Sequence, residues 1–300
     1  MKPLTSETVI NLWPDDGVGP GSERVSVQLT VTERDPLPHR RERVLTGITR
    51  PTMTAYLPDC PNGSSVIIAP GGGYARIMLD KEGAEMARWL NSQGVTAFVM
   101  HYRLPGEGHV DAANVPLQDA QRAVRIVRRH AVSWGLDPHR LGMLGSSSAG
   151  HMATWLAGCF DKTVYAAKDD ADQYSARPDF LLLLYPVVTM EAPFAHAGSR
   201  QNLLGTSPTD EEIAAHSTDR LVRPDTPPCF MVLADNDETV PSENAIRYYQ
   251  GLRRAGVSGE LHVFREGGHG FALDDVGDLP VAQWPQLAIA WMKSIGVLDQ

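Results

Sequence analysis

Three sets of residues in this chain have types and spacings that could carry out nucleophilic catalysis, and the first is Leu141–Ala153. There, an apolar run ends in Gly-Ser-Ser-Ser-Ala-Gly, and apolar residues then recur at helical spacing. Ser147 has Gly145 two positions before it and Ala149 two positions after it, as in the G-x-S-x-G turn between a strand and a helix. The hydroxyl of such a serine stands at a helix N-terminus, where free N–H groups favour developing negative charge. The spacing predicts Ser147 as a nucleophile.

Two other interpretations apply to the same stretch. Serine and glycine are common in any turn, so a serine-rich loop with no chemistry is the simplest alternative. A phosphate-binding loop would need lysine and then serine or threonine after the second glycine, but His151 and Met152 follow Gly150. The phosphate-binding interpretation is therefore excluded.

A nucleophilic serine requires a base, and ten histidines are available. His269 lies in Glu266–Phe271, just after the last predicted strand, and is the preferred candidate. His262 lies inside that strand and is expected to be structural, and His101 ends another strand, where a packing or pocket role is expected. His151 follows Ser147 closely but points along the predicted helix, so it is the minor alternative for the base.

The base in turn requires a carboxylate that orients it, and the segment 234–241 offers three acidic residues. Asp237 stands four positions before Pro241 in a D-x-x-V-P arrangement and is the preferred candidate. Asp235 is nearer the preceding strand and remains the alternative. Clusters of Asp and Asn are often simple turns, but this cluster follows a predicted strand that ends at the expected site.

The third set is the glycine triplet that follows a short apolar strand, in Pro70–Tyr74. Successive glycines let backbone N–H groups approach a ligand without an intervening side chain. The triplet predicts an oxyanion hole made by the N–H groups of Gly72 and Gly73 together with that of Ser148. A flexible turn is the alternative, whereas a dinucleotide fingerprint is excluded because Tyr74-Ala75-Arg76 does not complete G-x-G-x-x-G.

These motifs must be positioned by alternating strands and helices, which predict an α/β fold with a mostly parallel central sheet and helices on both faces. An edge strand is expected at Val25–Val31 and an exposed strand at Thr52–Leu57. The expected core strands are Ser65–Ala69, Thr96–Met100, the run ending at Leu144, Phe180–Tyr185, Cys229–Ala234 and Leu261–Phe264. Ligands of such sheets bind beyond the carboxyl ends of the strands, where all three motifs lie.

The domain organisation follows from length and pattern. Residues 1–300 are expected to form one α/β domain, with a small lid-like insertion of short helices at about 187–227, which is rich in Pro, Ser, Thr and charge. The net charge of −9 argues against nucleic-acid and anionic-membrane partners. Cys60, Cys159 and Cys229 are too few and too dispersed for a disulfide framework or a structural zinc site.

The expected location is cytoplasmic. Residues 1–11 lack the basic start, apolar core and cleavage site of a signal peptide, although a secreted form with a trimmed leader remains an alternative. No apolar run approaches the roughly 20 residues that span a bilayer. The sequence leaves the oligomeric state open, and a homo-oligomer is compatible with it.

Beyond these inferences, the chain resembles a known group, the α/β-hydrolase esterases related to acetyl xylan esterases and bacterial hormone-sensitive-lipase-like enzymes. The chain order of serine, acid and histidine is theirs. The elbow departs from their usual Gly-Phe-Ser-Ala-Gly-Gly, and Pro70 replaces the histidine of the lipase-like branch, which points to the acetyl xylan esterase branch. The shared motifs are Leu12–Pro14 with Pro20–Gly21, Ala69–Tyr74, Tyr102–Leu104, Asp119–Ala123, Trp134–Pro138, Thr226–Pro228 and Glu266–Phe271.

The resemblance implies an α/β-hydrolase fold and a serine carboxylesterase that needs no metal or organic cofactor. Its expected substrates are short-chain acyl esters of small molecules or oligosaccharides, with acetyl esters of sugars or xylan fragments favoured. Tyr74 and Tyr185 are expected to line the substrate cleft because of their placement. An amide or peptide hydrolase with the same triad and a non-catalytic binding protein on the same fold remain the alternatives, because a fold does not by itself decide function.

Overall fold

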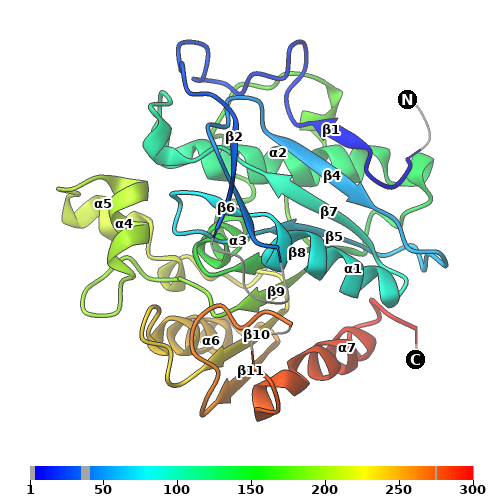
Figure 1. The fold of residues 1–300 in the computed structure, drawn as a ribbon, viewed down its shortest axis with the longest axis vertical. Helices are drawn as coiled ribbons and strands as arrows, with labels where there is room; N and C mark the ends of the chain where they lie inside the picture. The colour runs from blue at the N-terminus through cyan, green and yellow to red at the C-terminus, as the bar shows by residue number, and fades with distance from the viewer. Residues whose placement is uncertain (1–3, 35–40, 274–275, 300) are drawn as a thin grey trace.

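The computed structural model describes residues 4–34, 41–273 and 276–299, and its centre is an eight-stranded sheet (Figure 1). The strand order is β1-β4-β7-β5-β8-β9-β10-β11. The strands are β1 Val9–Asn11, β4 Thr52–Tyr56, β5 Ser65–Ala69, β7 Thr96–His101, β8 Leu141–Ser146, β9 Phe180–Leu184, β10 Cys229–Ala234 and β11 Gly259–Phe264. The six neighbouring strands β7, β5, β8, β9, β10 and β11 pair in parallel. β4 pairs antiparallel with both β1 and β7. The mostly parallel sheet predicted from the sequence is confirmed.

The central strands are buried along their whole length because both faces of the sheet are covered. All five residues of β5 are buried, as are all residues of β8, β9 and β10. Successive side chains of a strand point to opposite faces. Val66 and Ile68 accordingly join one core cluster and Ile67 joins the other. Continuous apolar runs of this kind are typical of parallel strands buried on two sides.

Helices form the outer layers. One core cluster contains residues of α2, α3 and α6, and the opposite cluster contains residues of α1 and α7, so the two sets cover opposite faces of the sheet. A short π-helical turn, Asp80–Ala84, leads directly into α1. The helices of the two layers are α1 Glu85–Ser92, α2 Val115–His130, α3 Ser148–Cys159, α6 Glu243–Ala255 and α7 Trp284–Ser294.

The N-terminal region differs from the prediction. The strand expected at Val25–Val31 is shifted, since β2 spans Thr30–Glu33 and the residues from Val25 to Leu29 have no strand hydrogen bonding. β2 pairs antiparallel with β3, Arg43–Thr46, which pairs with β6, Ile77–Met78, in a separate three-stranded sheet. Alternation of apolar and polar residues indicates only that the segment is extended. The position of the partner strand β3 decides which residues form hydrogen bonds.

Two further helices lie between β9 and β10. They are α4, Ala197–Leu204, and α5, Asp210–Ala215, both inside the interval 187–227 where short helices were expected. In Figure 1 they project together from one side of the sheet. Each has a side-chain cap, from His196 for α4 and from Thr209 in a capping box for α5. Such caps stabilise short helices by satisfying N–H groups that lack partners within the helix.

Candidate active site

Ser147 occupies a sharp turn between β8 and α3. Its backbone adopts φ 52° and ψ −122°, a conformation that is strained for a residue with a side chain. The turn is held from the neighbouring strand, because the N–H of Ser147 donates to the carbonyl of Leu184 (3.0 Å) and the N–H of Val187 donates to the carbonyl of Ser147 (2.9 Å). The turn directs the hydroxyl of Ser147 away from the sheet, at the N-terminus of α3.

The structure brings Ser147, His269 and Asp237 together in one chain of hydrogen bonds. Oγ of Ser147 lies 2.9 Å from Nε2 of His269, and Nδ1 of His269 lies 2.6 Å from Oδ2 of Asp237. A carboxylate accepts hydrogen bonds, so it selects the tautomer of His269 with the proton on Nδ1. Nε2 is then free to accept the proton of the serine hydroxyl. The side chain of His269 is 20% exposed and that of Asp237 only 1% exposed, so the imidazole is accessible while the carboxylate is not.

The geometry also distinguishes the two candidate carboxylates. Oδ1 of Asp237 accepts hydrogen bonds from the N–H groups of Thr239 (2.8 Å) and Val240 (2.9 Å), which leaves Oδ2 directed at the imidazole. Asp235 is exposed, and its recorded side-chain partner is the hydroxyl of Ser242 at 3.5 Å. The loop thus places Asp237, and not Asp235, beside His269.

The glycine loop lies against the nucleophile. A Cβ atom built on Gly71 would lie 2.9 Å from Cβ of Ser147, so the loop could not approach this closely with a side chain there. Gly72 has φ +137°, and a Cβ on it would lie 2.1 Å from the carbonyl oxygen of Arg76. Among the described residues, no acceptor is recorded for the N–H groups of Gly72 and Ser148. Both are therefore available to an incoming oxygen.

Gly73 differs from these two donors. Its N–H donates to Oγ of Ser148 (2.9 Å), which also accepts from the N–H of Tyr74 (3.3 Å). The predicted set of Gly72, Gly73 and Ser148 is thus gathered at one place, but the donor of Gly73 is occupied by a side chain. The cause is the serine at position 148, since a residue without a side-chain acceptor there would leave the N–H of Gly73 free.

A carboxylate that sequence reasoning did not identify braces this loop from beneath. Glu82, in the π-helical turn before α1, is only 5% exposed. Its Oε2 accepts the N–H of Gly71 (2.7 Å) and its Oε1 accepts the hydroxyl of Tyr185 (2.9 Å). A signal was present in the sequence, since Glu82 stands four residues before Met86 on the apolar side of an amphipathic segment. A carboxylate at such a position needs buried donors.

The two tyrosines expected to bind substrate are buried, and their hydroxyls have partners within the protein. Tyr74 is fully buried, and its hydroxyl lies 2.8 Å from Nδ1 of His151. Tyr185 is 1% exposed and donates to Glu82, while its ring packs edge-on against His269 with the ring centroids 5.0 Å apart. Burial raises the pKa of both phenols well above the usual value. The hydroxyls of both tyrosines are therefore already engaged inside the protein, and their role in substrate binding stays a prediction.

The remaining histidines considered as bases lie elsewhere. His151 is fully buried, its Nε2 donates to the carbonyl of His216 (2.8 Å), and its Nδ1 lies beside the hydroxyl of Tyr74, so both ring nitrogens are engaged away from Ser147. Burial lowers its pKa to about 3. Burial likewise lowers the pKa of His101 to about 4, and this ring lies 3.3 Å from the hydroxyl of Thr52. His262 is paired with Glu260 on the edge strand β11.

Several motif residues stabilise the scaffold rather than the site. Arg103 and Asp119 form a fully buried ion pair with Nη2 and Oδ1 2.7 Å apart, and the indole N–H of Trp13 donates to the same carboxylate oxygen (2.9 Å). The hydroxyl of Tyr102 donates to the carbonyl of Pro70 (2.8 Å), at the start of the glycine loop. These contacts connect the N-terminal segment, β7 and α2 to the loop that faces Ser147.

Helix α4 also contacts the glycine loop. The amide nitrogen of Asn202 donates to the carbonyl of Gly73 (2.8 Å). His196, which caps the helix, has its Cε1 atom 3.9 Å from the position that a Cβ of Gly73 would occupy. The insertion thus contacts the site directly, although its sequence showed only helix and turn signals.

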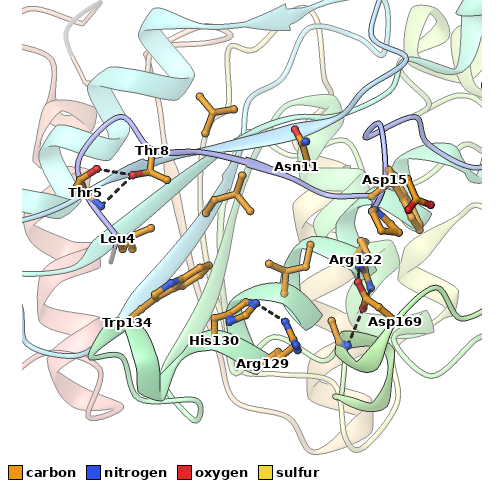
Figure 2. Close-up of a pocket in the computed structure, with 16 residues that line it drawn as sticks. Leu4, Thr5, Thr8, Asn11, Asp15, Arg122, Arg129, His130, Trp134 and Asp169 are labelled. Carbon is orange, nitrogen blue, oxygen red and sulfur yellow. Dashed lines mark hydrogen bonds and ion pairs between the residues drawn. The ribbon is translucent and has the colours of Figure 1, made fainter. Parts of the chain in front are cut away.

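A cavity of about 610 Å³ lies far from these groups, beneath β1 (Figure 2). Its wall includes the stacked rings of His130 and Trp134 and the ion pair between Arg122 and Asp169. β1 and β11 are at opposite edges of the sheet, and His269 follows β11. The cavity contains none of the reacting groups described above.

Metal-ligand clusters and membrane-spanning helices are both absent from the described part of the chain, residues 4–34, 41–273 and 276–299. No cluster of three or more His, Cys, Asp and Glu side chains that could hold a metal ion is present there. Nor does any helix in these ranges have the length and hydropathy needed to cross a bilayer.

Comparison with known proteins places this geometry in a family. A family model described as BD-FAE matches residues 53–252. The acetylxylan esterase of Xylanibacter ruminicola is 34% identical over 223 residues, which cover 73% of this chain and 43% of that protein. Endo-1,4-beta-xylanase B of Butyrivibrio fibrisolvens is 35% identical over 227 residues, 74% of this chain and 35% of that protein. The chain thus matches less than half the length of these two curated relatives.

Solved structures give the same result for the fold. An acetyl ester-xyloside bifunctional hydrolase from Caldicellulosiruptor lactoaceticus is 32% identical, covers 98% of both chains and has a TM-score of 0.80. An alpha/beta hydrolase from a deep-sea metagenome library is 23% identical, covers 91% of this chain and 99% of that one, and has a TM-score of 0.63. The resemblance to acetyl xylan esterases is confirmed: the chain belongs to the BD-FAE family and has the α/β-hydrolase fold.

Proposed function

We propose that this chain is a serine esterase that hydrolyses short acyl esters, with acetyl esters of sugars or xylan fragments as its substrate class. The observation that carries the proposal is the hydrogen-bonded chain from Ser147 through His269 to Asp237, beside a loop with free N–H groups. A strained serine, an oriented imidazole and preorganised donors are the parts that acyl transfer needs.

The reaction would proceed in two halves. Oγ of Ser147 attacks the ester carbonyl while Nε2 of His269 takes its proton, and the negative oxygen is held by the N–H groups of Gly72 and Ser148. The imidazolium, stabilised by Asp237, then protonates the departing alcohol and leaves an acyl-serine. Water attacks the acyl group, His269 takes the water proton, and the acid is released with Ser147 restored. The reacting groups are those of this chain, the ester and one water molecule.

The substrate class rests on the relatives. The names of the proteins that are 34% and 32% identical to this chain mention an acetylxylan esterase and an acetyl ester-xyloside hydrolase. The chain itself offers two features that suit a small acyl group joined to a polar alcohol. They are the glycine loop and the neighbouring helix α4, with His196 at its N-cap.

The test is a substrate panel with Ser147→Ala as the matched variant. Aryl acetate, butyrate and octanoate are assayed beside acetylated xylan and an aminoacyl anilide. We expect release of acetate from the aryl ester and from xylan, with rates that fall as the acyl chain lengthens, and a loss of at least about 10⁴-fold in Ser147→Ala with an unchanged circular dichroism spectrum.

Other outcomes favour the two alternatives. Faster turnover of the anilide than of the esters would indicate an amide hydrolase that uses the same groups. No turnover of any substrate by the wild-type chain would favour a binding protein on this fold. Retention of near-wild-type activity by Ser147→Ala would show that another residue is the nucleophile.

A further inference from the structure

The N-cap of α4 presents an accessible hydrogen-bond donor beside the candidate active site. His196 is half-buried and caps the helix through Nδ1, which lies 3.2 Å from the N–H of Ser199 and 2.7 Å from its hydroxyl. A backbone N–H can only donate, so Nδ1 must accept. The proton of the neutral ring therefore lies on Nε2. No acceptor for Nε2 is recorded among the described residues, and this atom is not among the buried atoms that lack partners.

Two observations place the ring beside the glycine loop. Cε1 of His196 is 3.9 Å from the Cβ position of Gly73, and the side chain of Asn202, two turns further along α4, donates to the carbonyl of Gly73 (2.8 Å). Helix α4 is thus attached to the loop that faces Ser147. The Nε2–H donor of His196 therefore stands on a helix that is bonded to the loop, and it needs little reordering when a substrate binds.

The ring of His196 is also subject to the electrostatic influence of His269 and Asp237. Burial lowers the pKa of His196, His269 lowers it further, and the carboxylate of Asp237 raises it. In acyl transfer the group that protonates the departing alcohol is His269. The alcohol portion of the ester must therefore lie beside His269 during the reaction.

We propose that His196 is a specificity-determining residue whose Nε2–H donates a hydrogen bond to a hydroxyl or ring oxygen of the alcohol portion, so that the site selects esters of polyhydroxylated alcohols, namely sugars. This inference rests on the proposed esterase function and specifies its leaving-group subsite. A site built to pair with a substrate hydroxyl discriminates against an analogue without it, because the site's donor is then left unpaired.

The test compares two acetates that differ in their hydroxyl groups. An acetylated methyl xyloside and cyclohexyl acetate share the acyl group and a six-membered ring, but only the first has hydroxyls and a ring oxygen. The central variant is His196→Asn, because asparagine is a favoured N-cap and keeps an acceptor for Ser199, while its side chain is too short to place a donor where Nε2 lies. His196→Ser serves the same purpose if the first variant does not fold.

We expect His196→Asn to lower kcat/KM for the acetylated xyloside about 5- to 20-fold, as befits one lost hydrogen bond to a substrate. The value for cyclohexyl acetate should stay within about twofold. His196→Gln, which restores an N–H donor at greater reach, should recover part of the loss. His139→Asn is the control, since His139 is exposed and outside the site, and it should change neither value.

The results separate the inference from the proposed function. Equal losses on both acetates, or no loss on the xyloside, would overturn the role of His196 while leaving an esterase in place. Hydrolysis of cyclohexyl acetate with no activity on the xyloside by the wild-type chain would also overturn it. A wild-type chain inert toward both acetates would refute the esterase function itself, and the subsite with it.

Discussion

Replacement of Glu82 tests whether the carboxylate beneath the glycine loop holds the oxyanion donors in place. This side chain touches neither the reacting serine nor the imidazole, but it accepts the N–H of Gly71 (2.7 Å) and the hydroxyl of Tyr185 (2.9 Å), whose ring packs against His269. Glu82→Gln keeps the shape and one acceptor oxygen, whereas Glu82→Ala removes both bonds. Gly71 and Tyr185 then lose the carboxylate to which both donate a hydrogen bond.

The magnitude follows from these contacts. A hydrogen bond to a charged group contributes about 1.5–3 kcal/mol, so Glu82→Gln should destabilise the fold by about that amount and lower Tm by about 3–6 °C. Removal of one oxyanion donor costs about 10²–10³ in kcat. A donor that is displaced rather than removed should cost less, so we expect a loss in kcat of about 10- to 100-fold. KM should change less than about threefold, because the donors act on the transition state.

The assay is steady-state hydrolysis of an aryl acetate with thermal unfolding of each variant. The matched control is Asp179→Asn. Asp179 is half-buried and, like Glu82, accepts a backbone N–H, that of Leu141 (3.0 Å), but it lies at the opposite end of β8 from Ser147. It should lower Tm without lowering kcat. If Glu82→Gln and Glu82→Ala both kept kcat within twofold of wild type, or lost kcat only in proportion to unfolded protein, the bracing role of Glu82 would be wrong.

Three further predictions concern single residues. Asp237→Asn should lower kcat about 10⁴-fold, because an amide selects the wrong imidazole tautomer, while Asp235→Asn should stay within about twofold; equal effects in the same aryl acetate assay would contradict the geometry. Ser148→Ala frees the N–H of Gly73, so kcat should rise about two- to fivefold and Tm should fall, whereas a tenfold loss in kcat would show that the hydroxyl itself assists the reaction. Burial lowers the pKa of His151 to about 3 in the folded protein, against about 6.5 when unfolded, so the unfolded state binds the extra proton between these values. The free energy of unfolding should therefore decrease as pH drops below about 6.5, and this group should account for about 2 kcal/mol of the decrease at pH 5. Urea unfolding at pH 7 and pH 5 should show a smaller decrease in His151→Gln than in the wild-type chain. An equal decrease in both would exclude His151 as its source.

The local features of this protein could be read from its sequence because they depend on neighbours along the chain. A short run such as Ser65–Ala69, which is apolar from Val66 onward, is typical of a strand covered on both faces, and the structure has β5 there. The small residues around Ser147 permit a tight strand–turn–helix, and the structure places a strained turn at that serine. The order of strands and helices limited the topology to a mostly parallel sheet, because parallel strands need crossover helices.

Tertiary structure alone decided which side chains face one another. The sequence left Asp235 and Asp237 as alternatives, since both follow the same strand, and only the path of the loop toward His269 separates them. Tyr74 and Tyr185 stand beside motif residues, yet both side chains point into the protein. The reason is physical: periodicity determines which face of its own element a residue occupies, whereas the bonds of Glu82 join residues 11 and 103 positions apart in the chain and exist only after distant elements have packed.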